Sequence, residues 1–161
     1  MSQWPACPCV RVSRRVRLLM VAVVIVAVAA PIGWYLASPL FIVNRGTEAP
    51  PSGFTTVATG SFVNGEPGHH ASGRADLLSD GATYIVRVST FSVTNGPDIR
   101  VFLAKGARVA AGDVDLGSVK VTEGSANYAV PEGVDPRGFA YVVIWCVPFS
   151  VQFGYAALAF S

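Results

Sequence analysis

A long apolar segment near the N-terminus is the first pattern along the chain. Residues 18–36 contain no charged side chain. A helix rises about 1.5 Å per residue, so this segment would span roughly 29 Å, close to the thickness of the hydrocarbon core of a bilayer. The pattern therefore predicts one transmembrane helix over residues 18–37, and the lipid bilayer is the first expected partner of the protein.

The charges on the two flanks of this segment predict its orientation. Four arginines lie within residues 1–17, whereas Arg45 and Glu48 are the nearest charged residues on the other side. Positively charged flanks stay in the cytoplasm, so residues 1–17 should be a cytoplasmic tail of a single-pass protein with an extracytoplasmic C-terminal domain. The alternative is a signal peptide cleaved near Ala27-Val28-Ala29, which would leave an exposed apolar end. Both alternatives export residues 40–161.

The exported part divides into a spacer and one domain. Residues 38–53 contain several prolines and glycines and are expected to form a stalk. Residues 54–161 are enough for one domain with a hydrophobic core. This domain holds seven basic and nine acidic residues, a balance of −2, so the positive net charge of the whole chain belongs to residues 1–53. We therefore expect no binding to nucleic acid.

Short alternating strands are predicted within residues 54–161. Apolar and other residues alternate along 84–89 and 99–104, and turn signals such as Asn64-Gly65 and Asp80-Gly81 recur between such runs. The stretch 139–160 is apolar almost throughout, with Pro148 expected at a break between two strands. No helical periodicity appears after the apolar segment. The pattern predicts an all-β domain, an antiparallel β-sandwich that follows one N-terminal transmembrane helix.

Cysteine usage singles out one residue of the domain. Cys7 and Cys9 precede the predicted membrane helix and should be reduced. Cys146 is the single cysteine after it, so no structural disulfide within the domain is available. Three interpretations stay open for Cys146: a small buried apolar residue, a redox-active or ligand-binding thiol, and a partner in an intermolecular disulfide.

The two histidines, His69 and His70, are adjacent. In a strand at most one of them would face a given site, because neighbouring side chains point to opposite faces. One histidine and one cysteine are too few ligands for a metal ion, so no metal site is predicted. The sequence also shows no serine triad, phosphate-binding glycine loop or supported carboxylate pair. These absences argue against a stand-alone enzyme.

Several motifs along the domain resemble the DM-thirteen family, an electron-transfer module of Skeletor-type cell-surface proteins and of membrane-anchored bacterial proteins. The resemblance covers residues 54–161 and rests on three motifs in a fixed order: Gly96-Pro97-Asp98, Asn127-Tyr128 and Ile144-Trp145-Cys146. Two departures lie in connections: Val121 replaces a usual glycine, and the 105–113 loop is compact. The resemblance implies that Cys146 acts in redox chemistry, as a bare thiol or as a ligand of a group such as haem. It also implies that His69 matches a recurring histidine.

The residues around Cys146 help to weigh these roles. Ile144, Trp145, Val147 and Phe149 are apolar, and such surroundings raise the pKa of a thiol and make it unreactive. An apolar, aromatic site with one sulfur ligand suits haem better than a bare reactive thiol. The sequence thus predicts a membrane-anchored electron-transfer component with an unidentified cofactor and an unidentified redox or cell-surface protein partner. The alternative is a non-catalytic β-sandwich that binds a surface partner, with Cys146 merely packed.

Overall fold

The structure is a computed structural model that describes residues 13–37 and 43–161. The chain divides into two compact units, residues 1–38 and residues 39–161. The predictions for Cys7, Cys9 and the rest of the cytoplasmic tail up to residue 12 lie outside the described residues. The second unit is called the β domain below.

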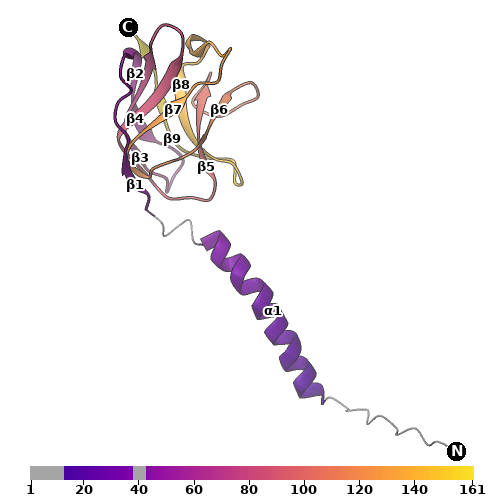
Figure 1. The fold of residues 1–161 in the computed structure, drawn as a ribbon. Helices are drawn as coiled ribbons and strands as arrows, with labels where there is room; N and C mark the ends of the chain where they lie inside the picture. Colours follow the sequence, from indigo (N-terminus) through magenta and orange to yellow (C-terminus); the bar gives the residue numbers. More distant parts are fainter. Residues whose placement is uncertain (1–12, 38–42) are drawn as a thin grey trace, which may run out of the picture. The chain divides into compact units, whose positions relative to one another are not determined.

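The described part of the N-terminal unit, residues 13–37, forms the helix α1 (Arg14–Ala37), as the apolar pattern predicts (Figure 1). It begins earlier than the apolar segment because Ser13 starts it: the Ser13 carbonyl accepts a hydrogen bond from the backbone N–H of Arg17 at 3.1 Å. Residues 14–35 are long and apolar enough to cross a membrane, and their side chains are exposed. Pro31 lies inside the helix, where a membrane-spanning helix tolerates it.

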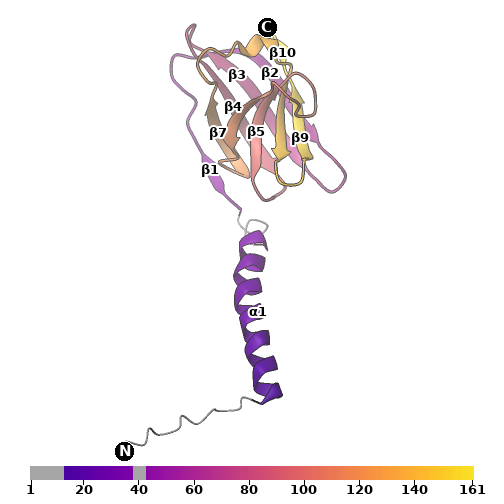
Figure 2. The same cartoon turned by 90° about the vertical axis from the view of Figure 1, so that its right-hand side faces the viewer.

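Within residues 43–161, the β domain consists of ten strands and one short 3-10 helix (Figures 1 and 2). They are β1 (Arg45–Thr47), β2 (Thr55–Asn64), β3 (Ala71–Ser79), β4 (Tyr84–Val93), β5 (Ile99–Ala104), β6 (Val114–Ser118), β7 (Glu123–Ala129), η2 (Pro136–Gly138), β8 (Tyr141–Cys146), β9 (Val151–Ala157) and β10 (Ala159–Phe160). Hydrogen bonds connect them in the order β1-β7-β4-β3-β2-β9-β8-β5-β6, and β10 pairs with β2. The domain is therefore mostly β, as predicted.

The arrangement of the strands differs from the predicted antiparallel sandwich. The strands form one curled sheet that resembles half a barrel, because β2 belongs to both of its halves. Residues 55–61 of β2 pair with β3, and residues 62–64 pair with β9. Gly60 permits the chain to pack closely there, since a Cβ on it would lie 2.3 Å from the Ala157 carbonyl oxygen. The sheet is also mixed, because β1 runs parallel to β7 while the other pairs are antiparallel.

The hydrophobic core lies inside this curl. Leu77, Val86, Leu103 and Ile144 are fully buried there, and each comes from a different strand. A second, smaller cluster covers the opposite face of β5 and β8 and includes Phe102 and Val143. Strands covered on both faces lose the alternating pattern, which explains why the segment around β8 is apolar throughout.

Part of the segment predicted as a stalk is a strand of the domain. In β1, Gly46 lies opposite Gly124 of β7. The strand is followed by Glu48, whose backbone N–H donates to the Ser125 carbonyl at 2.9 Å. Residues 45–48 therefore belong to the edge of the sheet. A composition rich in proline and glycine does not reveal such pairing, because the partner strand is almost eighty residues away.

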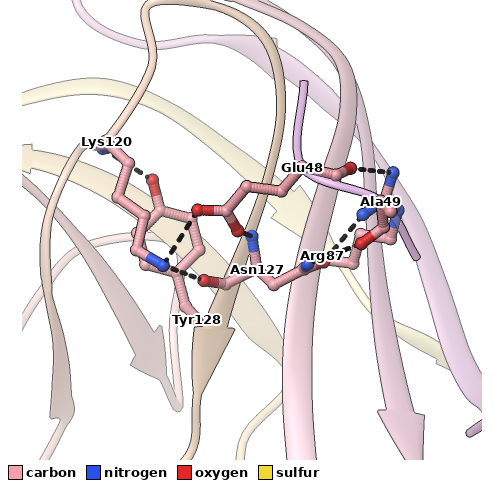
Figure 3. A network of polar contacts seen from close by, with 6 residues as sticks. All are labelled: Glu48, Ala49, Arg87, Lys120, Asn127 and Tyr128. Atoms are coloured by element: carbon pink, nitrogen blue, oxygen red, sulfur yellow. Dashed lines mark hydrogen bonds and ion pairs between the residues drawn. The ribbon is translucent and has the colours of Figure 1, made fainter. Parts of the chain in front are cut away.

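A group of polar contacts, called the Glu48 network, fixes this edge (Figure 3). The Glu48 carboxylate accepts a hydrogen bond from the Asn127 backbone N–H at 2.7 Å and lies 3.3 Å from the Lys120 ammonium. Arg87 donates to the Glu48 carbonyl at 3.1 Å and to the Asn127 side-chain oxygen at 2.7 Å. The Asn127 side-chain amide in turn donates to the Ala49 carbonyl at 2.9 Å. The network joins the N-terminal edge to β4 and β7.

Replacement of Glu48 by glutamine is expected to alter the pH dependence of stability. The hydrogen bond from Asn127, helped by Lys120, holds the pKa of the Glu48 carboxyl below its ordinary value. A lowered folded-state pKa contributes stability above the unfolded-state pKa of about 4.3, and that contribution is lost as the pH falls through the folded-state value.

We expect wild type to exceed Glu48→Gln in stability by less than about 1 kcal/mol at pH 7, because the carboxylate is partly exposed. Thermal unfolding measured between pH 3 and pH 7 should show this difference shrinking in acid. Glu123→Gln, which removes an exposed partner of Arg45 on the same edge, is the control. A difference between wild type and Glu48→Gln that grows on acidification would contradict the expectation.

Candidate functional site

Three connections meet around a cavity of about 450 Å³ at one end of the β domain. They are the β2–β3 loop, the β4–β5 loop and the β8–β9 turn. The lining residues are mostly apolar and are His69, Asn95, Gly96, Pro97, Cys146, Phe149, Val151 and Phe153. The cavity thus brings together both candidate ligand residues of the sequence, Cys146 and His69, and part of the Gly96-Pro97-Asp98 motif.

Cys146 ends β8 with its side chain on the inner face of the sheet. It is 1% exposed and packs in the main core together with Val142 and Ile144. The thiol donates a hydrogen bond to the Pro97 carbonyl, with 3.1 Å between sulfur and oxygen. Burial raises the pKa of the thiol, the nearby Asp98 carboxylate raises it further, and a hydrogen bond from the Phe149 backbone lowers it. Cys146 is therefore a protonated, shielded thiol, which is the opposite of an activated nucleophile.

His69 lies in the β2–β3 loop against the aromatic wall of the cavity. Its ring stacks on Phe153 with 4.1 Å between the ring centroids and 23° between the planes. Its Nδ1 atom is buried and has no hydrogen-bond partner among the described residues. A buried polar atom without a partner is costly and is characteristic of places where a water, ion or ligand binds. His70, the adjacent residue, is exposed.

The Gly96-Pro97-Asp98 motif connects the β4–β5 loop to the β8–β9 turn. Gly96 packs against Phe153 so closely that a Cβ would lie 2.6 Å from the ring. The Asp98 backbone adopts a left-handed conformation with φ 42°, and its carbonyl accepts a hydrogen bond from Val147 at 3.2 Å. The Asp98 carboxylate pairs with Arg100 at 3.0 Å. The motif thus shapes the cavity wall and presents the Pro97 carbonyl to the thiol.

The other motif residues, Asn127, Tyr128 and Trp145, do not line the cavity. Asn127 and Tyr128 are on β7, where they take part in the Glu48 network, and the Tyr128 hydroxyl accepts a hydrogen bond from the Lys120 backbone at 2.9 Å. Burial raises the pKa of Tyr128 to about 12. Trp145 packs on the outer face of β8, with the Arg108 guanidinium 5.5 Å from its ring centroid. The contacts of these three residues hold neighbouring segments of the β domain together.

Sequence reasoning did not single out Asn95, Phe149, Val151 or Phe153 as site residues. Aromatic and apolar residues in predicted strands are ordinarily core residues, and only the meeting of three loops makes them a cavity wall. The described ranges, 13–37 and 43–161, contain no group of three histidine, cysteine, aspartate or glutamate residues placed to hold a metal ion. The cavity therefore offers two candidate donors, a thiol and an imidazole, in apolar surroundings.

Comparison with known proteins identifies the family of the β domain. The chain matches no curated protein and no solved structure. A family model described as "Electron transfer DM13" matches residues 61–158. The matched region covers more than half of the chain and includes β3 to β9, with Cys146, His69 and all three sequence motifs. The chain therefore belongs to the electron-transfer DM13 family.

Proposed function

We propose that the protein is a membrane-anchored electron-transfer component whose redox group is held in the Cys146 cavity. The single observation that carries this proposal is that Cys146 and His69 line the same mostly apolar cavity, within a domain of an electron-transfer family. The helix α1 supports the anchoring part, because it is long and apolar enough to span a bilayer. The arginines at its N-terminal end favour an extracytoplasmic β domain.

The donor set of the cavity fits a haem-like group better than a bare thiol mechanism. A cysteine thiolate and a histidine imidazole are both known axial ligands of haem iron, and apolar walls control the reduction potential. Such a group, when bound, would supply reversible one-electron chemistry. Cys146 and His69 would hold it, and Phe149, Val151 and Phe153 would exclude water from it.

Binding would require a change at the thiol. In the structure the protonated Cys146 thiol donates a hydrogen bond to the Pro97 carbonyl, whereas a ligating sulfur must be deprotonated. Thus the bound group must stabilise the thiolate, in competition with the burial and the Asp98 charge that raise its pKa. His69 faces no such cost at Nδ1, because this atom gives up no protein hydrogen bond in the described structure.

An absorption spectrum of the full chain, purified from membranes, tests the proposal. We expect a visible-range chromophore whose bands change on reduction and are lost or shifted in Cys146→Ala and His69→Ala. Val151→Ala, which alters the same wall without removing a donor, is the control and should retain the chromophore. A wild-type protein that is colourless, and that acquires no chromophore when haem is added, would overturn the ligand role. It would favour the alternative, a binding domain in which Cys146 is packed.

A further inference from the structure

Exposed apolar side chains of the β domain gather at one end. Val43, Val147 and Phe149 are 46%, 42% and 68% exposed, and Pro148 between the last two is exposed as well. The strand β10, which includes Phe160, lies beside the C-terminus at the other end of the domain (Figure 2). Within the β domain, Figures 1 and 2 both show the start of β1 and the β8–β9 turn at the end away from the C-terminus.

The contacts around two neighbouring hollows confirm that these segments are close. Asn44 lines a hollow of about 250 Å³ together with Asn95 and Gly96 of the β4–β5 loop. Asn95 and Gly96 also line the Cys146 cavity, and Phe149 of the β8–β9 turn is another of its lining residues. The place where the chain joins the domain and the β8–β9 turn are therefore parts of one surface, called the N-proximal end below.

The connection that leads to this end is short and apolar. Seven residue steps separate Ala37, the last residue of α1, from Asn44, and a fully extended chain of that length spans at most about 25 Å. The sequence of the connection is Ser38-Pro39-Leu40-Phe41-Ile42-Val43, which contains no charge. A chain of this kind is suited to the membrane interface and poorly suited to a long water-exposed spacer.

The β8–β9 turn has the chemistry of a segment that can enter lipid headgroups. Its backbone donors are satisfied inside the protein: Val147 donates to the Asp98 carbonyl and Ser150 to the Val147 carbonyl, while the Phe149 N–H faces the Cys146 sulfur. Pro148 has no N–H to satisfy. The turn carries no charged residue. Insertion would therefore bury apolar side chains without stranding backbone polar groups in an apolar medium.

We propose that the N-proximal end docks on the lipid surface of the membrane that holds α1, with Val147, Pro148 and Phe149 inserted among the headgroups. Phenylalanine and other apolar side chains of proteins that lie on a membrane enter the boundary between headgroups and acyl chains. The occupant of the apolar surface is thus the bilayer itself. The proposal rests on the membrane anchoring in the proposed function, and it stands whether or not Cys146 holds a redox group.

Photocrosslinking of the full chain in phosphatidylcholine vesicles tests the docking. A benzophenone amino acid replaces Phe149 in one variant, Phe160 in a second and Val24 of α1 in a third. Phe160 is the matched control, because it is an exposed phenylalanine at the opposite end of the same domain. After illumination, lipid adducts are counted by mass spectrometry. Thermal unfolding of each variant verifies that the domain is folded.

We expect lipid adducts at position 149 to exceed those at position 160 several-fold and to approach those at position 24. Adducts at position 24 with equal, low yields at 149 and 160 would overturn the docking and leave the anchor intact. Absence of adducts at position 24 would overturn the membrane anchor, and the docking would fall with it. The Phe149→Ser variant should unfold at nearly the same temperature as the wild type, because the Phe149 side chain is mostly exposed.

Discussion

The substitution Gly124→Ala should destabilise the β domain strongly and detach β1 from the sheet. Gly124 has φ 126°, a conformation that side chains with a Cβ rarely adopt, and a Cβ there would lie 1.9 Å from the Gly46 carbonyl oxygen. The unfavourable backbone conformation costs about 1–3 kcal/mol. The contact cannot be relieved by rotation of a side chain, because the neighbour is backbone, and overpacking of this kind adds about 1–3 kcal/mol.

The matched control for this substitution is Gly117→Ala. Gly117 has φ 109°, close to that of Gly124, but a Cβ on it would meet nothing within 4 Å. The difference between the two variants therefore isolates the contact with β1. Thermal unfolding gives the loss of stability, and hydrogen exchange at residues 45–48 gives the detachment. If both substitutions lower the stability equally and hydrogen exchange in β1 is unchanged, the close approach of Gly46 and Gly124 does not contribute to stability.

The parts of the fold that depend on local pattern are visible in the sequence. The apolar run of α1 and the alternation in β4 and β5 each lie within about twenty residues, and the structure has a helix and strands there. The curl of the sheet depends on β2 pairing with β3, fifteen residues away, and with β9, about ninety residues away. Turn spacing records how many strands there are and not which strand is shared, so a sandwich and a half barrel give the same pattern.

The sequence likewise reveals only part of the candidate site. Cys146 and His69 can be proposed from the sequence, because an isolated thiol and a resemblance to a family point to single residues. The cavity that both residues line cannot be predicted from the sequence, because it depends on the stacking of His69 on Phe153 and on the Pro97 carbonyl that accepts a hydrogen bond from the thiol. Local sequence correctly indicates apolar neighbours of Cys146. The Asp98 charge, which also raises its pKa, comes from another loop.

The second large effect expected is the protection of Cys146 from alkylation. In a chain with Cys7→Ser and Cys9→Ser, iodoacetamide should modify the folded protein at least about a hundredfold more slowly than the urea-unfolded protein, a combined effect equivalent to about 2.7 kcal/mol. Two causes act together: the side chain is 1% exposed, and the thiol has a raised pKa, so little thiolate exists at neutral pH. The rate should therefore keep rising above pH 8.5, the ordinary value for a cysteine.

Charge and burial can be separated with one pair of variants. Asp98→Asn removes the carboxylate that raises the thiol pKa, and asparagine tolerates the left-handed backbone at this position. Asp115→Asn removes the other carboxylate bound to Arg100 and is the control. We expect Asp98→Asn to shift the pH profile of alkylation to lower pH while Asp115→Asn leaves it in place.

Since the thiolate is also the form that would bind a metal-containing group, the same shift should strengthen ligand binding at Cys146. Rapid alkylation of the folded wild type at neutral pH would instead mean that the thiol is open to solvent and activated, and the bare-thiol mechanism would then replace the ligand role.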